Sequence, residues 1–228
     1  MTYMTRQQQA VLDCIAACPG GCATAMVLAD RLRSGGQSVG LTTVYRQLER
    51  LEKLYDLDQQ YAEYDKVAAE VISQDPGNWY DTFMINKGSD DGIRVDNNVI
   101  AGKGLVGIVT EVGSSWATVR SIIDDNSSVS AMTVSTSDNC IVNGDLELID
   151  EGKLRFEQLY DQENKVTVGE RIVTSNISDK YVEGLFIGYV SEVEMDSNNL
   201  TKTGTIVSPV DFAHLKNVLV ITTLKEGQ

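Results

Sequence analysis

Three cysteines near the start of the chain have a spacing that could hold a metal ion. Cys14, Cys18 and Cys22 form a C-x₃-C-x₃-C pattern. A structural zinc site takes about four ligands in tetrahedral geometry, however, and no fourth ligand lies near this cluster in the sequence. Cys22 also follows the Pro19-Gly20-Gly21 break, whereas Cys14 and Cys18 can share a helix face. We therefore expect reduced, buried thiols in place of a metal site, and Cys140 stands alone.

A second group of candidate residues surrounds the only histidine of the chain, His214. Asp211 and Ser208 precede it closely, so the residue types of a Ser-His-Asp triad are present. No second histidine offers an alternative base, and serine contexts such as VTSNIS lack a loop that would form an oxyanion hole. We therefore expect no catalytic residue and no enzymatic activity, with His214 as a partly exposed structural or partner-contacting residue.

Two acidic stretches have some of the composition of calcium loops. They are DDGIRVDNN and EMDSNNL. Neither alternates its ligands through a glycine to a terminal glutamate, as an EF-hand loop does. Because Asn, Asp and Gly tolerate left-handed backbone, both stretches are predicted to be hairpin turns, and no metal or other cofactor is expected.

Tyr45 and Arg46 are the residues best suited to contact nucleic acid. Arginine can pair with phosphate or guanine, and tyrosine can pack on sugar and thymine methyl groups. Both residues lie in LTTVYRQLERL, within a helix predicted from residue 42 to about 65, which would be roughly 36 Å long. The alternative is that the two side chains simply occupy a solvated helix face.

The same helix carries an apolar seam with heptad spacing, which begins at Leu41 and weakens at Asp58. Its central positions form a candidate dimer seam: Val44, Leu48, Leu51 and Tyr55. Isolated coiled coils need about three or four heptads, so we expect only a weak homodimer through this seam.

The elements that would position these residues fall into two regions of different character. Residues 6–18 and 24–32 have helical periodicity, and the first 50 residues carry a net charge of +2. The whole chain of 228 residues carries −14, so the remainder carries −16, which argues against a chain that coats nucleic acid. We predict a helical segment over residues 1–50, a coiled-coil helix or linker over 51–66 and a β domain over 67–228.

Short runs rich in β-branched residues, separated by Gly, Asn and Asp, begin at Val67. They predict about nine or ten strands. The runs GLVGIVTEV and GLFIGYVSEV echo each other, which two barrel-like halves or two independent glycine-led strands would both explain. The fold class expected is mainly β with an α-helical N-terminal segment.

No run of about 18 apolar residues occurs, and the first 30 residues lack a signal-peptide pattern. As written, the chain is expected to stay in the cytoplasm.

Residues 4–52 resemble the winged-helix start of the ferric uptake regulator (Fur) family of repressors. The likeness rests on TRQQQAVLDCI, ATAMVLADRL and GQSVGLTTVYRQLERL. It implies that Tyr45 and Arg46 contact DNA in the major groove. The β-wing and the metal-binding dimerisation domain of that family have no counterpart here, so we do not expect DNA as a partner.

Residues 51–225 resemble the MreC family of rod-shape-determining proteins, from the end of its coiled coil through its β domain. The likeness includes LYDLDQQYAEYDKVAAEVISQDPGNWYDTFMINKGSDDGI, NNVIAGKGLVGIVTEVGSSWATVRSIIDD and DFAHLKNVLVIT. It implies two small β-barrels, here preceded by a long helix and a truncated winged-helix-like unit of three helices. The resemblance also implies a place at the extracytoplasmic face of the cell membrane.

Two functions from different classes follow from these resemblances. The first is a non-catalytic scaffold of the cell-wall elongation machinery that regulates cell shape. Its implied partners are MreD, the class B penicillin-binding transpeptidase, RodA and MreB. The alternative is a Fur-like DNA-binding transcriptional regulator with an acidic β sensor domain, which should bind duplex DNA with strong salt dependence.

Overall fold

The computed structural model divides the chain into two compact units, residues 1–61 and residues 62–228. The residues that it describes are 10–11, 13–14, 25–35, 44, 61, 64–74, 82–102, 104–145, 147–148, 151–161, 164–197 and 200–225. Within the described residues, no helix is long and apolar enough to cross a membrane.

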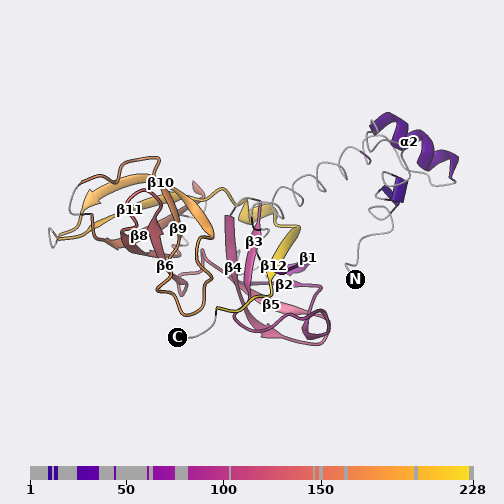
Figure 1. The fold of residues 1–228 in the computed structure, drawn as a ribbon, viewed down its shortest axis with the longest axis horizontal. Helices are drawn as coiled ribbons and strands as arrows, with labels where there is room; N and C mark the ends of the chain where they lie inside the picture. The colour runs from indigo at the N-terminus through magenta and orange to yellow at the C-terminus, as the bar shows by residue number, and fades with distance from the viewer. Residues whose placement is uncertain are drawn as a thin grey trace. The chain divides into compact units, whose positions relative to one another are not determined.

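The first unit contains helix α2, Ala25–Ser34 (Figure 1). Leu28, Ala29 and Leu32 are buried along one face, as the apolar periodicity predicted. The helix extends two residues beyond the expected end at Leu32, and the Gly35 amide closes it by donating to the Arg31 carbonyl at 2.9 Å. Residues 10–11 and 13–14 are helical as well, within the helix expected over 6–18.

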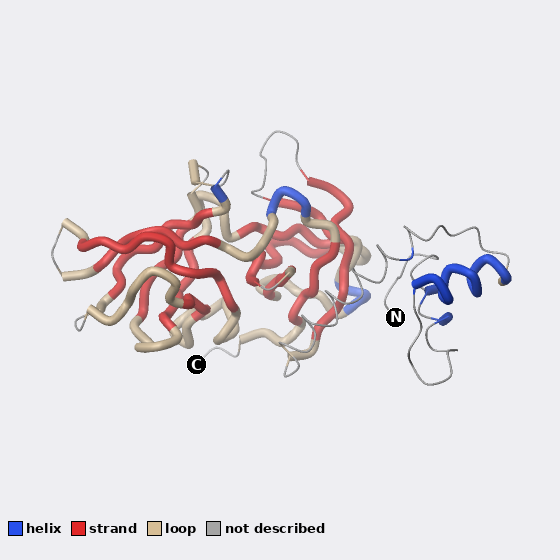
Figure 2. Tube along the Cα trace, turned by 90° about the horizontal axis from the view of Figure 1, so that it is seen from above, coloured by secondary structure: helices blue, strands red, loops and turns tan. Residues whose placement is uncertain are grey.

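The second unit consists of two closed barrels of six antiparallel strands each, drawn as the two groups of red strands in Figure 2. The first barrel has the strand order β1-β12-β3-β4-β5-β2. Its strands are β1 Lys66–Gln74, β2 Thr82–Ile85, β3 Asn98–Ala101, β4 Gly104–Val112, β5 Ala117–Ser121 and β12 Asn217–Ile221. The last strand of the chain therefore closes the barrel that the first strands begin.

The second barrel is inserted between β5 and β12 and has the strand order β10-β11-β8-β7-β6-β9. Its strands are β6 Ser128–Thr133, β7 Asn139–Asn143, β8 Lys153–Leu159, β9 Arg171–Thr174, β10 Phe186–Met195 and β11 Lys202–Val207. In most of these strands alternate residues are buried, so each strand lines the barrel core with one face and presents the other to solvent.

The structure confirms the prediction of two barrels but corrects the number of strands. The described residues form twelve strands, in place of the predicted total of about nine or ten. β3 and β4 form a hairpin within NNVIAGKGLVGIVTEV, whose composition predicts a single strand run, and β7 and β8 lie outside the predicted runs. β8 was missed because KLRFEQL contains no β-branched residue, although Lys153, Arg155 and Glu157 alternate with its apolar residues as in a strand with one solvated face.

The two segments that echo each other in sequence are β4 and β10, one in each barrel, and these two strands contact each other. Gly104 makes the close approach possible at the start of β4. A Cβ at this position would lie 3.0 Å from the Pro209 side chain and 3.2 Å from the Phe186 carbonyl oxygen. The echo therefore reflects equivalent places in two barrels that pack together.

Candidate docking surface and polar groove

An outward-facing row of side chains crosses the second barrel, and we call it the outer row. Its members are Val134, Arg171, Tyr189, Val207 and Lys153. Tyr189 is directly opposite both Arg171 and Val207, and Val207 is opposite Lys153. The Val134 amide donates to the Arg171 carbonyl at 3.0 Å. Because opposite residues of paired strands point to the same face, the five side chains form one continuous strip.

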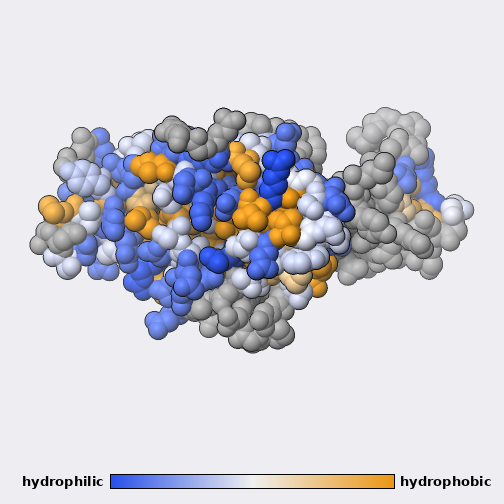
Figure 3. All heavy atoms as spheres, turned by 90° about the horizontal axis from the view of Figure 1, so that it is seen from below, coloured by the Kyte–Doolittle hydropathy of each residue, from blue (hydrophilic) through white to orange (hydrophobic). Residues whose placement is uncertain are grey.

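The centre of the outer row exposes apolar and aromatic surface. Tyr189 is 46% exposed, Val134 49% and Val207 40%. Figure 3 shows one face of the molecule, on which hydrophobic residues form separate orange groups among hydrophilic ones. Single exposed apolar residues are ordinary, but several on adjacent strands form a contiguous apolar patch, which is a feature of interaction sites.

Phe186 fixes the aromatic and cationic members of the outer row in place. Its buried ring meets the Tyr189 ring edge-on, with 5.0 Å between centroids and 70° between planes. The Arg171 guanidinium carbon lies 4.9 Å from the centre of the Phe186 ring. Edge-to-face and cation–π contacts of this kind hold side chains in one geometry. A partner would therefore find Tyr and Arg, two residue types enriched at binding hot spots, already ordered.

Charged groups border the outer row at Lys153. Its ammonium lies 2.8 Å from a Glu151 carboxylate oxygen and 3.2 Å from one of Glu192. The Lys153 ammonium donates hydrogen bonds to these two carboxylates, which raises the pKa of Lys153, so it remains charged at neutral pH. This gives the strip the apolar centre and charged rim that protein interfaces have.

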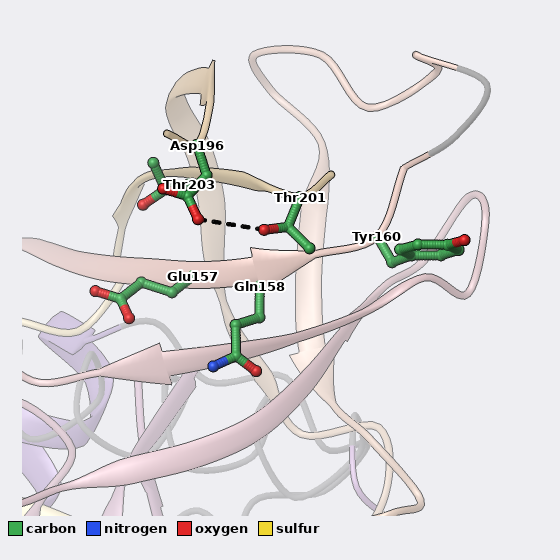
Figure 4. A pocket seen from close by; sticks show the side chains of 6 residues that line it. All are labelled: Glu157, Gln158, Tyr160, Asp196, Thr201 and Thr203. Carbon is green, nitrogen blue, oxygen red and sulfur yellow. Dashed lines mark hydrogen bonds between the residues drawn. The ribbon is translucent and has the colours of Figure 1, made fainter. Parts of the chain in front are cut away.

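A polar groove lies at another part of the same barrel (Figure 4). It has a volume of about 540 Å³ and is lined by Glu157, Gln158, Tyr160, Asp196, Thr201 and Thr203. Within it the Thr201 hydroxyl donates to Asp196 at 3.4 Å. Neither the outer row nor this groove was identified from the sequence. The only local signal for the row is Tyr189, an aromatic residue at an outward position of β10.

The structure brings together only part of the triad-like group around His214. His214 Nδ1 lies 2.9 Å from an Asp211 carboxylate oxygen, and both side chains are exposed. The Ser208 hydroxyl instead accepts a hydrogen bond from the Val210 amide at 3.3 Å and is buried. The His214 side chain is 75% exposed, and its structural or partner-contacting role stays a prediction.

The hairpin predicted for DDGIRVDNN was wrong, because this stretch joins β2 to β3, which do not pair with each other, and includes part of a 3₁₀ turn, Ser89–Asp91. EMDSNNL joins the paired strands β10 and β11, and its Asn198 and Asn199 lie outside the described residues. In DDGIRVDNN, Gly92 has a φ of 87°, and the Asp91 carboxylate binds the Lys87 ammonium at 2.6 Å. Hydrogen bonding to Lys87 holds the pKa of Asp91 below its ordinary value. In the described part of the chain, no group of three or more His, Cys, Asp or Glu side chains is arranged to hold a metal ion.

Most of the N-terminal candidates lie outside the described residues. These are Tyr45, Arg46, Leu48, Leu51, Tyr55, Cys18 and Cys22. Val44 is described, is helical and is fully buried. The Cys14 side chain is half-buried. Cys140 is buried, and burial raises the pKa of its thiol to about 12. The Cys140 thiol is therefore protonated and unreactive at neutral pH.

Comparison with known proteins identifies the barrel pair. The family described as "Rod shape-determining protein MreC, barrel core" matches residues 71–222. The chain belongs to the MreC family. The cell shape-determining protein MreC of Listeria monocytogenes is 34% identical over 78% of this chain and 60% of its own length. The MreC of Bacillus subtilis is 32% identical over 70% of this chain and 57% of its own length. The chain therefore spans about 60% of the length of these MreC relatives.

Solved MreC structures share the fold. A Listeria monocytogenes MreC structure aligns with a TM-score of 0.64 and 33% identity, over 88% of this chain and 97% of that one. A chain from a complex between penicillin-binding protein PBP2 and MreC of Helicobacter pylori aligns with a TM-score of 0.52 and 11% identity, over 70% of this chain and all of that one. These findings give no support to the Fur-like interpretation of residues 4–52 or to the regulator alternative.

Proposed function

We propose that this chain is a non-catalytic scaffold of the cell-wall elongation machinery, and that the outer row of its second barrel docks a class B penicillin-binding transpeptidase. Membership of the MreC family supports the scaffold role. A complex of an MreC with PBP2 in Helicobacter pylori supports a partner of this class.

The observation that carries the location is the ordered cluster of Arg171, Phe186 and Tyr189. A docking surface needs large side chains that lose little conformational freedom when a partner covers them. Tyr189 and Arg171 meet this requirement because the buried ring of Phe186 already fixes them. Val134 and Val207 widen the apolar contact, and the carboxylates around Lys153 supply a polar rim.

The other protein partners and the cellular location are part of the same proposal. By resemblance to the family, the assembly includes MreD, RodA and MreB, and the barrels lie at the extracytoplasmic face of the cell membrane. A weak homodimer through Leu48, Leu51 and Tyr55 would present two copies of the docking surface. Val44, also predicted to lie in this seam, is already buried within the protomer and is not available to a second chain. Two linked copies would raise the apparent affinity for an assembly that offers two binding sites.

The docking surface is tested by measuring binding of the chain to the purified extracytoplasmic part of the transpeptidase by interferometry. We expect Tyr189→Ala to weaken binding at least tenfold, or about 1.4 kcal/mol, because it removes the central anchor of the strip. Ile72→Ala is the matched control, since Ile72 is 55% exposed but lies on β1 of the first barrel. Equal affinities for wild type and Tyr189→Ala would place the transpeptidase elsewhere on the molecule.

A further inference from the structure

The polar groove of the second barrel is built around an irregularity in β8. Leu159 pairs with Lys202 and Phe156 pairs with Gly204, so Glu157 and Gln158 together stand opposite the single residue Thr203. Gln158 has a φ of 57°, a left-handed conformation that residues other than glycine rarely adopt. A bulge of this kind changes the direction in which the side chains leave the strand.

The bulge places two successive polar side chains on the outside of the barrel. Along β8 exposed and buried residues alternate up to Phe156, then Glu157 and Gln158 are both exposed, and Leu159 is buried again. A regular strand would turn one of the two inward. In the described part of the chain, neither the Glu157 carboxylate nor the Gln158 amide has a hydrogen-bond partner, so both remain available to a ligand.

The lining of the groove selects against anions. Of its six described lining residues two are acidic and none is basic. The remaining groups are an amide, two threonine hydroxyls and the Tyr160 ring, which is 52% exposed and lies at one end of the groove in Figure 4. The groove thus offers many hydrogen-bond acceptors together with one flat aromatic face.

A pyranose saccharide has the complementary chemistry. Its hydroxyl groups donate to carboxylates and amide oxygens, and the C–H face of a sugar ring packs on an aromatic ring. The volume of about 540 Å³ falls in the range of about 300–1,000 Å³ that small-ligand sites occupy. The Asp196 carboxylate is held in place by the Ser197 amide at 2.6 Å and by Thr201, so part of the site is ordered before a ligand arrives.

We propose that this groove binds a neutral or amino-substituted saccharide chain, with the ring of Tyr160 under one sugar and with Glu157, Gln158 and Asp196 accepting hydrogen bonds from its hydroxyls. Strain at Gln158 is retained because it aims the amide at the ligand. The site is separate from the outer row. Saccharide binding can therefore be tested independently of transpeptidase docking.

The full chain is titrated with two soluble probes, the β-1,4-linked tetrasaccharides of glucose and of N-acetylglucosamine, and binding is followed by calorimetry and by amide chemical shifts. We expect saturable binding of at least one tetrasaccharide, and the preferred probe distinguishes a plain from an amino-substituted sugar. Tyr160→Ala and Gln158→Gly should each weaken binding at least tenfold. Trp116→Ala, which removes an exposed aromatic ring from the first barrel, is the matched control and should leave the affinity unchanged.

Gln158→Gly also separates a binding role from a structural one. Glycine adopts a φ of 57° without strain, so the thermal midpoint of this variant should equal or exceed that of the wild type while binding falls. The proposal is overturned if neither tetrasaccharide binds at millimolar concentration. It is also overturned if both variants bind as well as the wild type, or if a tetralysine peptide binds in the groove and neither sugar does, which would make the groove a site for basic peptides.

Discussion

The ion pair between Lys202 and Asp161 orders the loop that follows β8. The Lys202 ammonium lies 2.7 Å from an Asp161 oxygen, and the side chains are 10% and 1% exposed. The same carboxylate accepts hydrogen bonds from the amides of Lys165 and Val166, both at 2.9 Å. Burial raises the pKa of Asp161, but the hydrogen bonds from Lys202 and the two amides outweigh burial and hold the pKa below its ordinary value of 3.8.

Because the folded state has the lower pKa, the ionised Asp161 stabilises the protein above the ordinary pKa, and this contribution is lost as the pH falls through the folded value. Lys202→Met should lower the free energy of unfolding by about 3–5 kcal/mol at pH 7, since it leaves a buried carboxylate without its cation. The deficit should shrink toward pH 4, where the unpaired carboxyl of the variant takes up a proton. Urea denaturation at the two pH values measures both effects.

Lys153→Met is the control for this change. Lys153 is paired with Glu151 and Glu192, whose side chains are 60% and 63% exposed, so water screens both pairs. Its loss should cost far less stability than the loss of Lys202. If both variants lost the same free energy of unfolding, burial of the Lys202–Asp161 pair would add nothing to its contribution to stability.

Among the structural elements, β3 links the two barrels through one side chain. Asn98 is 1% exposed, and its amide group donates to the Lys180 carbonyl at 3.0 Å and accepts from the Val182 amide at 2.8 Å. The neighbouring Asn97 instead donates to the Thr222 carbonyl at 3.2 Å, after β12. Two successive asparagines thus fix β3 to two different segments.

Asn98→Ala should destabilise the protein by about 1–3 kcal/mol for each backbone group that it leaves buried without a partner. The Val182 amide should also exchange its hydrogen with solvent faster, because it loses its acceptor. Asn139→Ala, at an exposed position of β7, is the control. Unchanged exchange at Val182 would show that this contact does not hold the barrels together. Thermal denaturation and hydrogen exchange followed by NMR provide the measurements.

The sequence predicted strands where β-branched residues are frequent, and it gave no signal where a side chain bonds to a segment distant in sequence. DDGIRVDNN was correctly assigned to a connection, since Gly92 and Asp96 adopt left-handed backbone, but the hairpin predicted there was wrong because β2 and β3 do not pair. The junction role of Asn98 depends on residues more than 80 positions away and has no local signal. The same holds for the bulge at Gln158, which depends on the register of β8 against β11.

At the scale of the whole molecule, the sequence predicted two barrels but not which strands close each one. β12 has the composition of a buried strand, whereas β1 mixes apolar and polar residues. Only their pairing, Lys66 opposite Ile221 through Glu70 opposite Asn217, shows that the second barrel is inserted within the first. Pairing between strands so far apart in sequence requires the intervening barrel to bring them together. The β domain should therefore fold as one cooperative body.

Residues 67–225 should then fold without the start of the chain. The β domain closes both barrels with its own strands, and about 160 residues can bury enough surface to be stable alone. Deleting residues 1–40 should leave its thermal transition almost unchanged and its transpeptidase binding intact, because the outer row lies on β9, β10 and β11 and the adjoining ends of β6 and β8. Calorimetry and interferometry of the truncated chain measure both. If the deletion unfolded the barrels or abolished binding, the two compact units would form a single cooperative unit with one integrated function.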